Sequence, residues 1–429
     1  MSALERMLEE FAAQPGPAAA QREAAAALRE GALPTRHDEN WHYADLRAIE
    51  SVQRFTPADA AHAAAADAAA LALPAPLPGF TRLVLCDGRL LPASAQVLAN
   101  TTALQRLPRA AASAAGSDAF DASIDGRLGL LAAMFTPEPL ALRIQGQLAL
   151  EIIAVGSAGT TTRYTDLAIE LAPDARLALV ERQLDDTADP GAAARAAPFL
   201  CGRLRLQLGA RAELLHTRLQ QAAGTALLYD TSTVSVGEQA RYQLRDITAG
   251  AGSARTTMQI CLAGREAATQ IVALAAARDT QRADSQYTVL HEAAGTHSDV
   301  LFRAIASDRA RVACSADVQV AASARGARVL QSLRGLIDGK GAEIDLRPRL
   351  TINTNEVRAA HGATTGRLDE DLLFYLLSRG LAPEAARSLL KWAFLGEVLA
   401  ALGPPELRRE AETASAARLS DAPAAELLQ

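Results

Sequence analysis

The chain has 429 residues, which exceeds the usual size of one folding unit and allows two or three units with a large core. Its 43 basic and 49 acidic residues give a formal net charge of −6, so a nucleic-acid-binding surface is not expected. Charged residues between positions 5 and 10 exclude the apolar core of a signal peptide, and no uncharged apolar run is long enough to cross a membrane. We therefore expect a cytoplasmic protein with no membrane segment.

The four cysteines agree with a reducing compartment. They lie far apart and form no Cys-x-x-Cys pair, so the sequence predicts no disulfide framework. Three of them have no potential ligand beside them in sequence and are assigned no role: Cys86, Cys201 and Cys261.

Three regions follow one another along the chain. Residues 1–79 are expected to form a helical domain, residues 80–352 a β domain, and residues 353–429 a second helical domain. In the first region, apolar residues between Leu4 and Phe11 are spaced like one face of a helix, which Pro15 to Pro17 ends.

In the β domain the period of the apolar residues changes from 3.6 towards 2, with a short helical insertion expected near residues 126–135. A small polar corner recurs between alternating segments, at Leu171–Leu177, Leu208–Leu214 and Val236–Tyr242. Such a repeat suggests stacked β-coils that bury their apolar faces against their neighbours. An ordinary β-sandwich has similar strand spacing and stays an alternative.

The last region predicts three helices. The first runs from Asp369 to Arg379, with acidic residues in its first turn and Gly380 as its stop. Pro383 is expected to begin a second helix, and a weaker third is expected over residues 406–419.

Motifs for chemistry are sparse. The segment from Gly335 to Gly341 lacks the Ser or Thr of a phosphate loop, so the chain is not expected to hydrolyse ATP. His291 and His297 lie six residues apart, and on one extended strand they would share a face, as a metal-ligand pair requires. A solvated strand face explains the same spacing and is the favoured interpretation.

The most informative stretch is residues 356–380, which reads Glu-Val-Arg-Ala-Ala-His-Gly-Ala-Thr-Thr-Gly-Arg-Leu-Asp-Glu at its start. It resembles the SufB/SufD family of iron-sulfur cluster assembly scaffolds, which usually has Val-Lys-Cys-Ser-His-Gly-Ala-Thr followed by a Leu-Asp-Glu helix start. Ala359 stands where that family usually has Cys. Further parts of the resemblance are Leu33-Pro34 with Arg36, Asn40-Trp41, Tyr43 and Leu46; Leu83 to Pro92; Asp308 to Arg311; and Gln331-Ser332.

Within the family the SufD-type branch is favoured, since a SufB-type chain would be expected to carry a Glu beside the motif His and more cysteines. The resemblance implies a mainly β fold, a right-handed parallel β-helix flanked by N-terminal and C-terminal helical domains. It thereby favours stacked coils over the sandwich. Cys314 occupies a position where the family tends to have an aromatic core residue, so we expect it to be buried.

The resemblance also implies a function. The chain would be a non-catalytic scaffold subunit that pairs with a SufB-type chain through strands near Leu333 to Asn353. His361 would lie at the cluster-assembly interface and supply a metal ligand beside a partner's thiolate. A His-Gly turn that only ends the β-coil is an equally weighted interpretation. Because Ala359 replaces the Cys, most sulfur ligands would come from the partner.

The resemblance further implies that the C-terminal helices dock a SufC-type ATPase. Four residues are expected to be exposed there for partner binding: Tyr375, Arg379, Lys391 and Trp392. No stably bound cofactor is expected; a transient iron-sulfur cluster would form at the partner interface, and ATP would act only through the partner. Two alternatives remain, a self-pairing relative and a carbohydrate-active β-helix enzyme.

Overall fold

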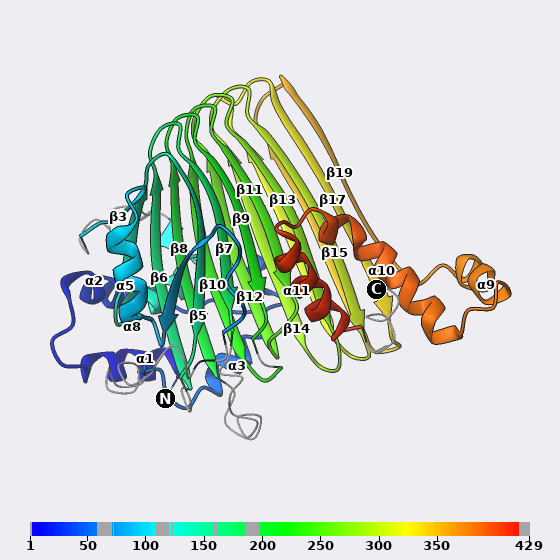
Figure 1. The fold of residues 1–429 in the computed structure, drawn as a ribbon, viewed down its shortest axis with the longest axis horizontal. Coiled ribbons are helices and arrows are strands. Elements are labelled where there is room, and N and C mark those ends of the chain that lie inside the picture. The colour runs from blue at the N-terminus through cyan, green and yellow to red at the C-terminus, as the bar shows by residue number, and fades with distance from the viewer. Residues whose placement is uncertain are drawn as a thin grey trace.

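The computed structural model describes residues 2–57, 71, 73–108, 120–121, 123–157, 161–184, 198–222 and 224–419. Its centre is a parallel β-solenoid of about seven turns, formed by two sheets that face each other (Figure 1). Strands that follow one another along the chain mostly lie in opposite sheets, and each pairs in parallel with the strand two positions later. The expected mainly β fold with stacked coils and flanking helices is confirmed.

The strands of each sheet follow one another in space from the first coil to the last. Sheet A contains β2 (Arg89–Leu90), β1 (Thr81–Cys86), β5 (Gln147–Val155), β7 (Arg176–Gln183), β9 (Glu213–Gln220), β11 (Arg241–Thr248), β13 (Ala268–Ala277), β15 (His297–Ser307), β17 (Ala327–Asp338) and β19 (Val357–Gly366). Sheet B contains β3 (Leu104–Arg106), β4 (Leu140–Ile144), β6 (Thr162–Leu171), β8 (Phe199–Leu208), β10 (Leu227–Val236), β12 (Ser253–Leu262), β14 (Arg282–His291), β16 (Arg311–Val320) and β18 (Glu343–Ile352).

The core lies between the two sheets. Because side chains alternate across a strand, every second residue of a coil points inward and stacks on its counterpart in the next coil. One such column passes through Leu208, Val236 and Leu262, which are register partners and at most 2% exposed. Each coil thus buries its apolar face against its neighbours, as a solenoid must.

The polar corner that recurs in the sequence forms a ladder of backbone hydrogen bonds from coil to coil. Four residues with positive φ, between 56° and 62°, occupy equivalent corners: Asp174, Arg211, Gln239 and Glu266. The N–H of each donates to a carbonyl of the next coil, for example Arg211 N to Glu238 O at 2.8 Å. The alanine that follows each is fully buried, as at Ala212 and Ala240. A larger side chain would not fit there, which explains why alanine recurs.

Helices cover the outer faces of both sheets. On sheet B lie α1 (Ala3–Ala12), α2 (Ala19–Arg29), the 3-10 helix η1 (Glu39–Trp41), α3 (Leu46–Glu50) and α8 (Arg127–Phe135), in a cluster that includes Tyr164, Phe199 and Tyr229 of the sheet. The expected helical insertion is therefore confirmed as α8. Residues 58–70 of the expected N-terminal helical region lie outside the described residues.

The C-terminal helices are α9 (Glu370–Ser378), α10 (Pro383–Ala400) and α11 (Pro405–Ala416), close to the three expected. Helices α10 and α11 pack on the outer face of sheet A, where Leu395 and Leu407 are buried against Ile247 and Leu274. Helix α9 projects away from the solenoid (Figure 1). Strand β19 lies beyond residue 352, so the β structure ends later than the expected domain boundary.

Replacing Gly264 by Ala tests the stacking at the corners. An added Cβ would overlap the backbone N of Glu238 in the preceding coil, so one backbone must move. We expect unfolding free energy to fall by about 2 kcal/mol or more, measured by denaturant titration. The control is Gly396→Ala in α10, where nothing lies within 4 Å and helix propensity should add up to about 1 kcal/mol. Equal stability of the two variants would contradict the close coil contact.

Candidate functional site: the open end of the solenoid

The two ends of the solenoid differ. At the first coil, helix α5 (Pro92–Asn100) packs on β1 and β3, and its Leu98 enters the core between the sheets. At the other end, both sheets finish in an edge strand, β18 and β19, with no further described strand beside them. Nine of the ten residues of β19 are exposed and the tenth, Val357, is half-buried. We call the surface of β18 and β19 the open end.

The open end exposes the inside of the fold as well as two strand edges. The inward residues Leu346 and Leu350 of β18 and Val357 of β19 contact the core but are only partly buried. Ile352 at the end of β18 is 38% exposed. An internal layer of the solenoid would have these residues fully covered by the next coil. The open end therefore combines two features. One is a layer of the core that is only partly covered, and the other is a pair of strand edges whose backbone donors and acceptors have no described strand beside them.

His361 lies in the middle of β19. Its register partner on β17 is Gln331, whose side chain is buried and whose Nε2 donates to Ala316 O at 3.0 Å. His361 therefore occupies the face of the strand that looks between the sheets, yet it is exposed because no described coil covers it. The interpretation of His361-Gly362 as a turn is wrong, because both residues are in the strand. Ala359 shares this face and offers no ligand atom.

Helix α9 forms the second part of the site. Asp369 caps its start by accepting from the N–H groups of Asp371 and Leu372, at 2.9 and 3.0 Å, and Gly380 with φ 91° follows its end. No residue of α9 is buried. Its exposed side chains are largely apolar: Leu372 (52% exposed), Phe374 (72%), Tyr375 (53%) and Leu377 (36%). A well-capped helix with this much exposed apolar surface is typical of an interaction site.

Two of the four residues expected to be exposed for partner binding are so, and two are not. Tyr375 and Arg379 are exposed, with the Arg379 guanidinium 5.2 Å from the centre of the Tyr375 ring. Lys391 and Trp392 are only 1% and 8% exposed, so their expected exposure is wrong. Lys391 forms an ion pair with Asp338 of β17, and Trp392 packs in the core beneath α10. Both hold α10 on the solenoid.

Further ion pairs fasten the C-terminal helices to sheet A. Arg303 of β15 pairs with Glu397 of α10 at 2.7 Å, and Arg182 of β7 pairs with Glu410 of α11 at 3.0 Å. The Arg182 side chain is only 1% exposed, which makes its pairing costly to break. Helices α10 and α11 are thus firmly attached, whereas α9 extends from them without buried contacts of its own.

Both interpretations of His291 and His297 are wrong, the favoured solvated strand face and the metal-ligand pair. His291 ends β14 and His297 begins β15, so the two residues lie in opposite sheets on either side of a turn. His291 is buried, with its ring nitrogens 2.8 Å from Thr296 Oγ1 and from Ser298 Oγ. Burial, with a smaller contribution from His297, lowers the pKa of His291 to about 4. It is a neutral core residue and no metal ligand.

Cys314 is fully buried, as expected, and burial raises the pKa of its thiol well above the usual range. Cys86 and Cys201 are buried too, and Cys261 is partly buried. Among the described residues, no group of three or more His, Cys, Asp or Glu side chains is arranged to hold a metal ion. No helix in the described ranges is long and apolar enough to cross a membrane.

The fold and the site define a parallel β-solenoid protein with a projecting apolar helix and one end that no described element caps. Residues 153–394 match the family model of the SUF system FeS cluster assembly, SufBD core domain, and the chain belongs to this family.

Relatives in three bacteria carry the family's name. The chain is 27% identical to the iron-sulfur cluster assembly protein SufD of Escherichia coli over 405 residues, covering 89% of this chain and 88% of the relative. It is 32% identical to a SufBD family protein of Synechocystis over 194 residues, covering 45% of this chain and 43% of the relative. A SufBD family protein of Mycobacterium tuberculosis is 36% identical over 159 residues, which are 35% of this chain and 40% of the relative.

Sequence reasoning missed the residues that make the site apolar, among them Ile352 and Phe374. One signal was available. The helix from Glu370 to Ser378 reads Glu-Asp-Leu-Leu-Phe-Tyr-Leu-Leu-Ser. Its apolar residues lie around the whole circumference, so the helix has no polar face to turn towards solvent.

Stability measurements distinguish buried from exposed residues on these helices. We expect Trp392→Ala to lower the free energy of unfolding by about 3 kcal/mol, because it leaves a cavity beneath α10. Tyr375→Ala should change it by less than about 0.5 kcal/mol, because that side chain is 53% exposed and its contact with Arg379 lies on the surface. Thermal and denaturant unfolding of the two variants would check this. A stable Trp392→Ala variant would show that α10 is not held by its core face.

Proposed function

We propose that this chain is a non-catalytic scaffold subunit of iron-sulfur cluster assembly, which pairs through its open end with a SufB-type chain and docks a SufC-type ATPase through α9. The observation that carries the proposal is the incomplete last layer of the solenoid. A solenoid needs a polar capping unit at each end for solubility, and β18 and β19 have none among the described residues. A second β-solenoid with its own unpaired strands would complete the layer by strand addition.

A SufB-type partner is favoured by the family to which the chain belongs and by the extent of its similarity to the SufD of Escherichia coli. A second copy of this chain would offer the same two edges and stays the alternative. No observation on the described residues favours carbohydrate cleavage, and we do not propose it.

The cluster itself would be cargo held between two chains. His361 is the residue of the open end best suited to touch iron, because a neutral imidazole is a good ligand and this one is exposed on the inward face of β19. Ala359 supplies no thiolate, and the described cysteines are buried or partly buried elsewhere. The sulfur ligands would therefore come from the partner.

The ATPase would act through α9 and α10. Docking on α9 would bury Phe374 and its neighbours, which now face solvent. Helix α10 connects α9 to the solenoid and is attached by Lys391 to Asp338 on β17 and by Glu397 to Arg303 on β15. Strand β17 pairs directly with β19. A displacement of the helices would thus reach the open end through two ion pairs and the strands β15 and β17, which gives nucleotide binding by the partner a route to the interface.

Charge placed in the open end tests the pairing. Co-expressed with a SufB-type chain, the wild type should form a mixed complex, and Ile352→Arg should weaken it by at least about tenfold, because an arginine would be buried unpaired. Val97→Arg on α5 is the matched control, since Val97 is equally exposed, at 38%, at the opposite end. Complex mass and affinity are the measurements. A particle with the mass of two copies of this chain would support self-pairing instead.

Truncation of the central aromatic residue of α9 tests the docking. We expect Phe374→Ala to weaken ATPase binding by about 2 kcal/mol, since large exposed aromatic side chains dominate such interfaces. Leu389→Ala on α10, a residue 42% exposed, should leave binding unchanged. Unaltered binding by Phe374→Ala would remove α9 as the docking element.

Substitution of His361 tests the ligand role. After anaerobic reconstitution of the mixed complex, His361→Ala should lower the visible absorbance of the cluster while the complex stays intact. His297→Ala is the control, because His297 is also exposed and lies on β15, away from the open end. If the absorbance and its decay are the same in both variants, His361 is not a ligand.

A further inference from the structure

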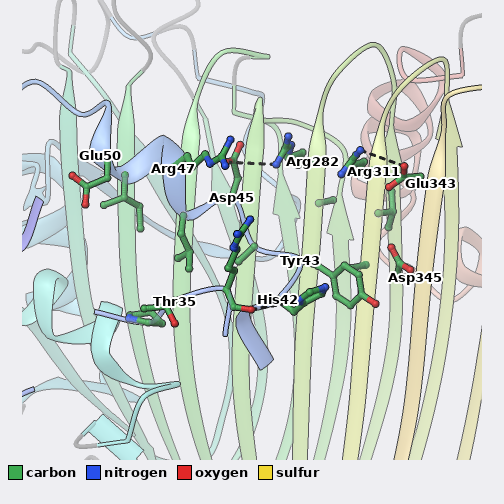
Figure 2. Close-up of a pocket in the computed structure, with 18 of the residues that line it drawn as sticks. Thr35, His42, Tyr43, Asp45, Arg47, Glu50, Arg282, Arg311, Glu343 and Asp345 are labelled. Atoms are coloured by element: carbon green, nitrogen blue, oxygen red, sulfur yellow. Dashed lines mark hydrogen bonds and ion pairs between the residues drawn. The ribbon is translucent and has the colours of Figure 1, made fainter. Parts of the chain in front are cut away.

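A second site lies on the outer face of sheet B. Residues 33–47, which we call the strap, cross this face and leave a cleft of about 740 Å³ between the strap, α3 and the first residues of β14, β16 and β18 (Figure 2). This volume lies in the range of small-molecule sites, which is roughly 300–1,000 Å³. The cleft borders the open end at Glu343 and Asp345 of β18, but the proposed scaffold function assigns it no ligand.

The walls of the cleft are fixed in place. Trp41 of the strap is fully buried, its Nε1 donates to Asp125 Oδ1 at 2.8 Å, and the Arg255 guanidinium lies 4.4 Å from the centre of its ring. The Tyr229 hydroxyl donates to Asp45 O at 2.7 Å, which ties the strap to β10. Because buried contacts hold its walls, the cleft is preformed, and ligand binding would cost little conformational entropy.

Four arginines and four acidic residues belong to the polar lining. Arg282 and Arg311 are register partners on β14 and β16, so their side chains start from adjacent strands at one level. Each has one acidic neighbour, Asp45 at 3.6 Å and Glu343 at 3.2 Å, but their side chains are 42% and 56% exposed. Ion pairs this exposed are weak and leave guanidinium donors free. Figure 2 shows both pairs along one side of the cleft.

Two more arginines of the cleft have no such neighbour. Arg36 and Arg47 are exposed, and within the described ranges their side chains form no hydrogen bond or ion pair. Four guanidinium groups therefore line one cavity.

The remaining acids of the cleft are Glu50 and Asp345. Glu50 accepts from the Ala3 N–H at 3.0 Å and lies 3.9 Å from Arg6, so it is directed towards α1. Burial and the nearby Glu343 raise the pKa of Asp345, and the nearby Arg347 opposes this shift. Four arginines thus face three acidic side chains, Asp45, Glu343 and Asp345, and two of the arginines have no acidic partner among the described residues.

Apolar residues from both walls supply much of the remaining lining, beside the polar Thr35, His42 and Tyr43: Leu33, Leu46, Ile49, Ala283, Val312 and Ala313. We propose that the cleft binds a small organic phosphate, with the phosphate on the arginines and an apolar or aromatic body against these side chains. A phosphate monoester carries close to two negative charges at neutral pH and three acceptor oxygens, which suits several guanidinium groups better than a single carboxylate does.

The test is isothermal titration calorimetry of the full-length protein with 1-naphthyl phosphate. Inorganic phosphate and 1-naphthol, which correspond to the two halves of this probe, are titrated separately for comparison. We expect saturable binding of 1-naphthyl phosphate at least about tenfold tighter than that of either half. Arg47→Gln and Arg311→Gln should each weaken it about tenfold. Arg211→Gln is the control, because the Arg211 side chain is also 56% exposed and pairs with Asp174 outside the cleft.

Three results would overturn the proposal. One is the lack of saturable binding of 1-naphthyl phosphate at millimolar concentration. The second is inorganic phosphate binding as tightly as the ester, which would mean an unspecific anion patch. The third is equal weakening by Arg211→Gln and Arg311→Gln, which would mean a general charge effect. Thermal unfolding of each variant verifies that the exposed substitutions leave the fold intact.

Discussion

The stacking of coils in register is the constraint on which the rest of the molecule depends. A single coil has two short strands and one apolar face, and only another coil can cover that face. The corners make the stacking possible: Arg211 and Gln239 adopt positive φ so that their N–H groups reach the next coil, and Ala212 and Ala240 leave room for it. The same dependence makes the last coil incomplete. The open end is a direct consequence of how the core is built.

The architecture could be predicted from the sequence where local rules decide it. The corner pattern repeats because each coil meets the same steric condition. The caps of α9, with Asp369 at its start and Gly380 after its end, are local as well. The histidine pair failed because the assumed continuous strand is interrupted by the turn between His291 and His297. A period of two holds only within one strand.

Features that depend on distant partners were not predictable. Helical spacing shows that Lys391 and Trp392 belong to one helix, but the burial of Lys391 requires Asp338, which lies 53 positions earlier and on another element. The exposure of α9 shows the opposite error. An apolar segment is read as core by every local rule, and only the position of α9 beyond the end of the sheets leaves it uncovered. The strap cleft depends likewise on residues 33–47 meeting residues 282–345.

The parallel edges of the open end have a mechanical consequence. A partner that adds its strands to β18 and β19 would continue both sheets across the junction, so the two chains would behave as one twisted beam rather than as two bodies joined by side chains. Torsion applied at either end of such a beam is shared by every coil. The stiffness of the assembly would then be a property of the backbone ladder, and substitutions at corners far from the junction would alter how the joint responds to load.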